Sequence, residues 1–243
     1  MGILQDKIAI ITGGARGQGA SEARLFVAEG AQVILTDLDT VAGEALAAEL
    51  GGNAAFQRHD VANRADWDMI ADFARKRFGR VDILINNAGI TSYESVQAIS
   101  PAQMQRYLDI HLFGALHGIQ TITPLMTAGG SVVNIASTAA LRGMGGYIGY
   151  GVSKWALRGL TRYAAHDLVD QKVRVNTVLP GGVDTPMLNQ AAGAELIDAA
   201  RNAVPMRRFA SADELARTVL FLASDQSSYM TGAEMVVDGG LNA

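Results

Sequence analysis

Short runs of β-branched and aliphatic residues alternate along the chain with longer, alanine-rich segments of helical periodicity. The short runs are almost continuously apolar, which is typical of strands in a parallel sheet covered on both faces. They predict strands at residues 7–11, 32–36, 54–58, 82–85, 131–135, 174–178 and 234–237. The longer segments predict helices at residues 18–29, 40–50, 64–78, 101–123, 150–170 and 211–223.

This alternation predicts an α/β fold, namely a Rossmann-type doubly wound parallel sheet in three layers, α/β/α. No linker, repeat or low-complexity tract divides residues 1–243, so we expect a single domain. Residues 181–206 interrupt the alternation and hold a small helical pattern at 191–203. An insertion after the carboxyl end of a strand lies where such sheets bind ligands. We therefore expect a substrate lid at about 184–206, with an ordinary helical excursion as the alternative.

Composition and charge exclude several classes of protein. Hydrophobic residues make up 49% of the chain, which supports a sizeable core. The net charge of −4 gives no basic surface for nucleic acid, and the absence of cysteines excludes disulfides and thiolate ligands. The histidines have no partners at metal-binding spacing, so no metal site is expected. The first residues lack the layout of a signal peptide and no apolar stretch reaches membrane-spanning length, so we expect a cytoplasmic protein without a membrane partner.

A glycine-rich turn follows the first predicted strand. Thr12 is followed by Gly13-Gly14-Ala15-Arg16-Gly17-Gln18-Gly19 and then by a helical segment. The glycines let the backbone approach a pyrophosphate, and the free N–H groups and positive dipole end of the helix favour phosphate. This strand–turn–helix context indicates a dinucleotide site, although glycine-rich turns without a ligand also occur.

Asp37, at the end of the second predicted strand, favours NAD as the cofactor. A carboxylate at this place can accept both ribose hydroxyls of NAD, and it repels the additional phosphate of NADP. Two alternatives stay open. Asp37 could cap the helix that begins near Thr40, a role that Asp39 could fill instead. Arg16 could bind the 2′-phosphate of NADP.

Two further strand ends are candidates for the adenosine side of the site. Asp60-Val61 follows the third strand and could bond the adenine edge. Asn86-Asn87-Ala88-Gly89 follows the fourth strand and could pin the edge of the sheet there. Both segments could equally be turns, for which Asp, Asn and Gly are the usual residues.

Ser137, Tyr150 and Lys154 form a candidate proton-transfer set. Tyr150 and Lys154 are four residues apart in a predicted helix, so their side chains share one face. A nearby ammonium favours the phenolate, so we expect Lys154 to lower the pKa of Tyr150 toward the range of a general acid or base. Ser137, close to the end of a strand, could hold an alcohol or carbonyl oxygen beside them.

Together these motifs resemble the classical short-chain dehydrogenase/reductase family over essentially the whole chain. The matching motifs occur in the order and at the spacing of the family: Thr12-Gly13-x-x-x-Gly17-x-Gly19, Asn86-Asn87-Ala88-Gly89, Ser137, Tyr150-x-x-x-Lys154, Asn176, Pro180-Gly181 and Asp238-Gly239-Gly240. Within the family the chain looks most like the NAD-dependent hydroxysteroid and alicyclic alcohol dehydrogenases.

The resemblance implies a role for each member of the set. Tyr150 is expected to be the general base in alcohol oxidation and the acid in carbonyl reduction. Lys154 is expected to lower the tyrosine pKa and to hold the nicotinamide ribose, and Ser137 to stabilise the reacting oxygen. The expected cofactor-binding residues are Gly13, Arg16, Gly17, Gln18, Gly19, Asp37, Leu38, Asp60, Val61, Asn87, Gly89, Tyr150, Lys154, Pro180, Val183 and Thr185.

One position departs from the family pattern. The family usually has Asn in a stretch like Asp109-Ile110-x-Leu112-Phe113-Gly114, where this chain has His111. In the family, this site interrupts the helical bonding so that a backbone carbonyl can hold a relay water behind the lysine. Backbone chemistry survives substitution and an imidazole can bond the chain or a water, so we expect catalysis to persist with His111 as a relay substitute. The alternative is a histidine that fills the helix packing.

The expected substrate side of the site is largely apolar. The residues placed around the reacting oxygen are Ser137, Tyr150, Leu141, Met144, Tyr147 and Met187. Such a pocket suits a hydrophobic secondary alcohol or ketone, whether alicyclic, terpenoid, steroid or aryl-alkyl. An NADPH-dependent 3-ketoacyl reductase is one alternative, and Asp37 and the acidic charge balance count against it. A nucleotide-sensing or scaffold protein is another, but it would be expected to lack the Ser–Tyr–Lys set. The resemblance further implies a homotetramer.

Overall fold

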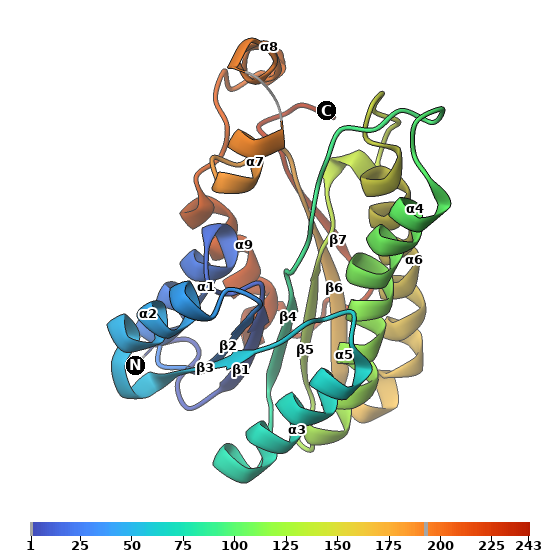
Figure 1. Cartoon of the computed structure of the whole chain (residues 1–243). Helices are drawn as coiled ribbons and strands as arrows, with labels where there is room; N and C mark the ends of the chain where they lie inside the picture. Colours follow the sequence, from blue (N-terminus) through green and yellow to red (C-terminus); the bar gives the residue numbers. More distant parts are fainter. Residues whose placement is uncertain (1, 192–193) are drawn as a thin grey trace.

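A seven-stranded parallel sheet forms the centre of the protein (Figure 1). The structure is a computed structural model that describes residues 2–191 and 194–243. Its strands are β1 (Ile8–Thr12), β2 (Gln32–Asp37), β3 (Ala54–Arg58), β4 (Ile83–Asn86), β5 (Gly130–Ile135), β6 (Val173–Pro180) and β7 (Glu234–Val237). They lie in the order β3-β2-β1-β4-β5-β6-β7. The predicted Rossmann-type doubly wound sheet is confirmed, and each strand lies within two residues of its predicted bounds.

Helices cover both faces of this sheet (Figure 1). On one face lie α1 (Gly17–Ala28), α2 (Thr40–Leu50) and α9 (Ala212–Ala223), and on the other lie α3 (Arg64–Phe78), α4 (Pro101–Leu108), α5 (Gly114–Ile122) and α6 (Ile148–Asp167). Successive strand residues point to opposite faces. Ile11 and Leu35 therefore pack with α1 and α9, whereas Ile10 and Ile34 pack with α3 and α5.

Side-chain caps account for where several helices begin. The Asp39 carboxylate accepts the N–H of Ala42 at 3.0 Å and starts α2, so the cap left open between Asp37 and Asp39 is made by Asp39. Ser100 and Ser211 start α4 and α9, each in a capping box. Asp37, the last residue of β2, is therefore not used as a helix cap.

The chain leaves neighbouring strands β1 and β4 in opposite directions, toward α1 on one face of the sheet and α4 on the other. β1 pairs with β2 on one side and with β4 on the other. The helices that follow these strands lie on opposite faces of the sheet, so a crevice forms beyond the carboxyl ends of β1 and β4. This switch point is where the fold places a ligand site.

Two predicted helices differ from the observed ones. The segment predicted as one helix at 101–123 is divided by a π-helix, η2 (Asp109–Phe113), between α4 and α5. The predicted lid holds two short helices, α7 (Pro186–Ala191) and α8 (Ala194–Ala203), and residues 192 and 193 within it lie outside the described residues. At the base of this segment, Val183 pairs with Ala210 in a β-bridge.

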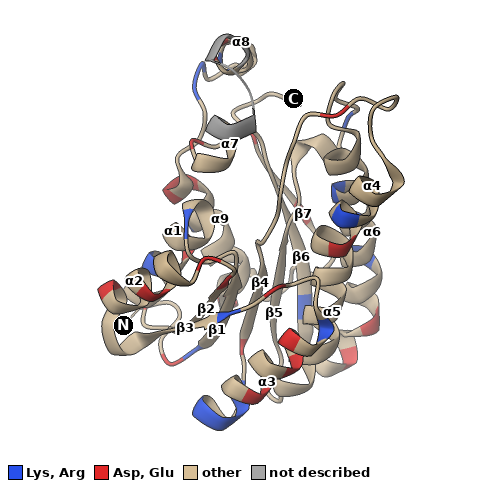
Figure 2. Cartoon of the chain, viewed as in Figure 1, with Lys and Arg blue, Asp and Glu red and all other residues tan. Residues whose placement is uncertain are grey.

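Charged side chains of both signs are distributed over the helices and loops around the sheet (Figure 2). No helix within residues 2–191 and 194–243 is both long enough and apolar enough to cross a membrane.

Candidate active site

A cavity of about 760 Å³ lies beyond the carboxyl ends of the strands, at the switch point. It collects nearly all the residues predicted to bind a cofactor: Gly13, Arg16, Gly17, Gln18, Asp37, Leu38, Asp60, Val61, Asn87, Gly89, Tyr150, Lys154, Pro180, Val183 and Thr185. Gly19 alone of that set does not line it. Its place is structural, because a Cβ there would lie 2.7 Å from Asn87 Nδ2 and 2.9 Å from Gly14 Cα.

The glycine turn is held open for an anion. Gly13 and Gly17 have φ values of 62° and 56°, in the left-handed region that favours glycine. Asn87 Nδ2 donates to the carbonyls of Thr12 at 2.9 Å and Gly13 at 3.1 Å, which pins the turn to the end of β4. The N-cap residue Arg16 makes no side-chain hydrogen bond to α1, so its first N–H groups stay available to a phosphate. A dinucleotide pyrophosphate fits this turn.

Asp37 lies beside the glycine turn at the end of β2. Its Oδ2 accepts the N–H of Ala15 at 3.2 Å, and its Oδ1 accepts the N–H of Asp39 at 3.0 Å. A carboxylate has about four acceptor sites, so both oxygens can still accept ribose hydroxyls. The Arg16 guanidinium forms an ion pair with Asp39. Arg16 is the cation nearest to Asp37 among the lining residues that the structure describes. Its charge is therefore already paired with a carboxylate.

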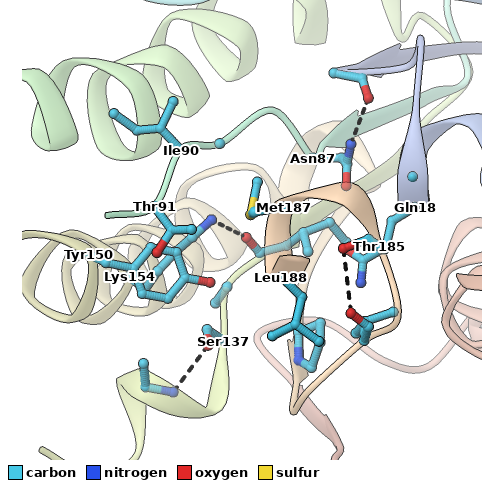
Figure 3. Close-up of a pocket in the computed structure, with 18 of the residues that line it drawn as sticks. Gln18, Asn87, Ile90, Thr91, Ser137, Tyr150, Lys154, Thr185, Met187 and Leu188 are labelled. Carbon is cyan, nitrogen blue, oxygen red and sulfur yellow. Dashed lines mark hydrogen bonds between the residues drawn. The ribbon is translucent and has the colours of Figure 1, made fainter. Parts of the chain in front are cut away.

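Ser137, Tyr150 and Lys154 meet where β5 ends and α6 begins (Figure 3). Lys154 Nζ donates to the Ile135 carbonyl at 2.8 Å and lies 5.7 Å from the centroid of the Tyr150 ring. Ser137 Oγ accepts the N–H of Ala139 at 3.1 Å, which fixes its direction. In Figure 3 the Tyr150 hydroxyl faces Ser137 across a shared space. The predicted set is thus assembled in one place.

Burial dominates the electrostatics of this set. It raises the pKa of Tyr150, which the neighbouring Ser137 hydroxyl lowers only in part. It also lowers the pKa of Lys154, which is 4% exposed, to about 7. Lys154 does not contribute to the pKa shift of Tyr150, so the expected lowering of that pKa is not found. Its Nζ lies 5.7 Å from the centroid of the ring and donates to the Ile135 carbonyl. The raised pKa therefore favours the protonated phenol of Tyr150 at neutral pH.

His111 lies behind the set and does not line the cavity. It is 2% exposed, within the π-helix η2. Its Nε2 accepts the N–H of Ile90 at 3.0 Å, and its Nδ1 lies 2.7 Å from Ser153 Oγ. The proton relay expected at this residue stays a prediction.

The substrate side of the cavity is apolar, as its sequence indicated, but its residues differ in part. Met144, Tyr147 and Met187 line it as predicted. Leu141 does not: the short turn Thr138–Ala140 directs it to a small core cluster that includes Leu157. Further lining residues are Ile90, Thr91, Tyr93, Leu188, Ile197, Val204, Phe209 and Leu241. Figure 3 shows Met187 and Leu188, from the predicted lid, across the space from Thr91 and Tyr150.

Phe209 and Leu241 were missed by the sequence analysis. Leu241 follows a turn in which the Asp238 carboxylate accepts the N–H groups of Gly240 and Asn242, each at 2.9 Å. Gly239 and Gly240 have φ values of 63° and 88°, so this turn requires glycine. The Gly239 carbonyl accepts the N–H of Met206 at 3.2 Å and joins the turn to the lid. The glycine pair is the signal that could have pointed to Leu241.

The fold and the glycine turn define a dinucleotide-binding α/β protein, with Ser137, Tyr150 and Lys154 together at its switch point. Residues 13–242 match the sequence model of a family described as enoyl-(acyl carrier protein) reductase. The chain belongs to the short-chain dehydrogenase/reductase family.

Three relatives illustrate its neighbourhood in this family. A 3-alpha-(or 20-beta)-hydroxysteroid dehydrogenase of Mycobacterium bovis is 41% identical, over 98% of this chain and 90% of its own. A trans-4-hydroxycyclohexanecarboxylate dehydrogenase of Sinomonas cyclohexanicum is 39% identical, over 99% and 94%. An NADP-dependent (R)-specific alcohol dehydrogenase of Lentilactobacillus kefiri is 36% identical, over 99% and 98%.

Proposed function

We propose that the protein is an NAD-dependent alcohol dehydrogenase that interconverts an uncharged, hydrophobic secondary alcohol and its ketone. The observation that carries the proposal is the place of Ser137, Tyr150 and Lys154, between the cofactor-binding strand ends and an apolar wall of the same cavity. Alicyclic, steroid, terpenoid and aryl-alkyl alcohols all belong to this class. The name of the hydroxysteroid relative supports it, and the cyclohexanecarboxylate relative supports the alicyclic alcohol but not the absence of charge.

Each residue of the set has a defined task in this reaction. When bound, NAD supplies the carbon that accepts the hydride in oxidation. Tyr150 accepts the hydroxyl proton of the alcohol in oxidation and returns it to the carbonyl oxygen in reduction. The Ser137 hydroxyl donates to the same oxygen, and Lys154, held by the Ile135 carbonyl, would reach the nicotinamide ribose.

Asp37 and Asp39 support NAD rather than NADP. The 2′-phosphate of NADP would meet the Asp37 carboxylate, and like charges in contact cost several kcal/mol (roughly a hundredfold or more in affinity). The cation that could compensate, Arg16, is engaged with Asp39. One relative is named NADP-dependent, so the preference for NAD or NADP differs among similar proteins. The preference of this chain for NAD is therefore argued from its own Asp37 and Asp39.

The lining of the substrate side supports an uncharged substrate. Among the lining residues that the structure describes, the cations are Arg16, which is paired with Asp39, and Lys154, which donates to the Ile135 carbonyl. The trans-4-hydroxycyclohexanecarboxylate dehydrogenase acts, by its name, on a carboxylate. Cyclohexanol and 4-methylcyclohexanol should therefore be better substrates here than trans-4-hydroxycyclohexanecarboxylate.

The test is NADH release from a panel of cyclic and aryl-alkyl alcohols, with NAD and NADP compared. Tyr150→Phe should lower kcat by roughly a hundredfold to ten-thousandfold, the usual contribution of a positioned general base. Tyr229→Phe, at a fully exposed tyrosine, is the matched control and should retain the activity. Turnover only of 3-ketoacyl thioesters with NADPH would replace the proposal by the ketoacyl reductase. NAD binding without turnover of any substrate would favour a nucleotide sensor.

The pH dependence should have opposite signs in the two directions. Burial raises the pKa of Tyr150, and oxidation needs its deprotonated form, so kcat for oxidation should rise with pH into the alkaline range. Reduction needs the protonated phenol, so its kcat should fall over the same range. Equal pH profiles in both directions would contradict Tyr150 as the proton carrier.

A homotetramer and a cytoplasmic location remain predictions from the family resemblance. Trp155 and Tyr163 on α6 are 48% and 78% exposed in the single chain, so this helix offers apolar surface to a second copy. Sedimentation of the purified protein tests the tetramer.

A further inference from the structure

His111 has a hydrogen-bond partner on each side of its ring. Nε2 accepts the backbone N–H of Ile90, in the loop after β4, at 3.0 Å. Nδ1 lies 2.7 Å from Ser153 Oγ on α6, and Ser153 Oγ in turn donates to the Tyr150 carbonyl at 2.8 Å. The imidazole therefore connects a loop that lines the cavity with the helix that carries Tyr150 and Lys154.

The partners determine the protonation state of the ring. A backbone N–H can only donate, so Nε2 must carry a lone pair toward Ile90. The neutral ring then has its proton on Nδ1 and donates it to Ser153 Oγ, whose own proton goes to the Tyr150 carbonyl. Protonation of Nε2 would place two N–H groups against each other.

The surroundings also disfavour a charged ring. Burial and the neighbouring Lys154 cation hold the pKa of His111 well below its usual range. The other titratable groups against the ring are the phenols of Tyr107 and Tyr150, with ring centroids 5.9 and 5.6 Å away. None of these groups is a carboxylate that would stabilise an imidazolium.

The chain of hydrogen bonds has no exit for a proton. It begins at the amide of Ile90 and ends at the carbonyl of Tyr150, and a peptide amide or carbonyl does not exchange protons at catalytic rates. His111 also lies outside the cavity, so no substrate oxygen reaches it. The geometry thus fits a mechanical role better than the relay expected from the sequence.

We propose that His111 is a positioning residue that holds the Ile90 loop and the catalytic helix α6 at a fixed separation, and that it transfers no proton. This inference rests on the proposed function, since it concerns the same Tyr150. The chain provides room for a ring at this position through Gly89, where a Cβ would lie 3.0 Å from His111 Nε2. In place of the short amide that is usual in the family, an imidazole therefore spans from Ile90 to Ser153.

Two substitutions separate positioning from proton transfer. His111→Gln keeps one acceptor and one donor at similar separation but cannot carry a proton near neutral pH, whereas His111→Leu fills the space without bonds. We expect His111→Gln to retain kcat within a few-fold and to leave the pH profile of kcat unchanged. His111→Leu should lower kcat/KM by roughly tenfold to a hundredfold through misplacement of Tyr150, again with an unshifted pH profile. Ser153→Ala, which removes only the helix-side partner, should give a smaller loss.

His166→Leu, at an exposed histidine of α6, is the control for loss of a histidine as such. A His111→Gln variant with normal thermal stability but the low activity of His111→Leu, or with a shifted pH profile, would overturn the proposal in favour of the relay. Nitrogen-15 NMR of the ring gives a readout independent of turnover. We expect the Nδ1–H tautomer without titration between pH 5 and 9, and a ring that titrates in this range would also overturn the proposal. The proposed function fails separately, if the parent protein oxidises no alcohol.

Discussion

The two halves of the cavity are built by different means. The cofactor half consists of strand ends and the glycine turn, around Gly13, Asp37 and Asn87, and much of it is backbone held by hydrogen bonds to other strands. The substrate half consists of side chains from segments outside the sheet: the loop at residues 90–93, the loop at 144–147, the lid, and the turn before Leu241. Ser137, Tyr150 and Lys154 lie where the two halves meet.

This difference determines how each half responds to change. Backbone in close contact cannot move without disturbing the sheet, so a single added atom should disrupt the cofactor half. Side chains on loops can be substituted without disturbing the sheet. Substitutions in the substrate half should therefore change which alcohol is preferred and leave the protein folded and active. Substitutions in each half should therefore have separable effects on the KM of cofactor and of alcohol.

The first prediction concerns an alanine at Gly19, in the cofactor half. Its Cβ would lie 2.7 Å from Asn87 Nδ2 and 2.9 Å from Gly14 Cα, inside the backbone of the turn. We expect Gly19→Ala to lose about 1–3 kcal/mol of stability and to bind NAD at least about tenfold more weakly. The matched control is Gly145→Ala in the substrate half, where a Cβ meets nothing within 4 Å. Isothermal titration with NAD and thermal melting measure both, and equal losses in the two variants would refute the comparison.

A second prediction concerns the cofactor half alone. Asp37→Ser removes the carboxylate that would repel the 2′-phosphate of NADP, so the ratio of kcat/KM for NADP over NAD should rise about a hundredfold. The KM for the alcohol, measured at saturating cofactor, should stay within twofold. Asp37→Ser combined with Arg16→Ala should gain less, because the double variant lacks the guanidinium that could exchange its ion pair with Asp39 for one with the 2′-phosphate. An unchanged cofactor ratio would show that Asp37 does not face the ribose.

The same division explains what the sequence could predict. Every strand followed from short apolar runs, and the residues predicted at the strand ends line one cavity, because parallel strands bring their carboxyl ends to one edge. The loop at residues 180–185 came from the family resemblance instead. The π-helix η2 had no signal in the hydrophobic pattern of residues 101–123, and only the family resemblance indicated interrupted helical bonding at His111, which lies within η2. Leu141 was misplaced because a single short turn decides whether it faces the core or the cavity. Leu241 was missed because its position depends on two left-handed glycines far along the chain.

A third prediction concerns the substrate half alone. Leu241→Ala removes a half-buried apolar side chain from the wall of the cavity. Full burial of a Leu contributes about 1.5–3 kcal/mol, so this partly exposed one should contribute less. We expect the KM for a bulky alcohol such as a steroid to rise roughly tenfold or less, while the KM for NAD stays unchanged. A small alcohol such as cyclohexanol should respond less, since it leaves the far wall untouched. If the KM values of large and small alcohols rise together, Leu241 supports the lid without contacting the substrate.

The last prediction concerns Glu22, which lines neither the cofactor half nor the substrate half of the cavity. It lies on α1, is 1% exposed, and neither carboxylate oxygen has a hydrogen-bond partner among the residues described. Burial raises its pKa from 4.5 to about 8. Unlike Ser21 beside it, which donates to Asp213 on α9, Glu22 makes no bond across the helix interface.

Glu22→Gln should therefore change stability and leave catalysis intact. Between pH 4.5 and about 8 the folded protein keeps the proton that the unfolded chain releases, so this group's contribution to stability is complete below pH 4.5 and is lost as the pH rises. The slope is at most about 1.4 kcal/mol per pH unit. Glutamine cannot ionise, so urea unfolding of the variant should show a flatter dependence on pH than the parent, with unchanged KM values for NAD and alcohol. If the KM for NAD changed instead, the packing around Glu22 on α1 would affect the glycine turn at the start of that helix. Cofactor binding would then depend on buried residues of α1 as well as on the strand ends.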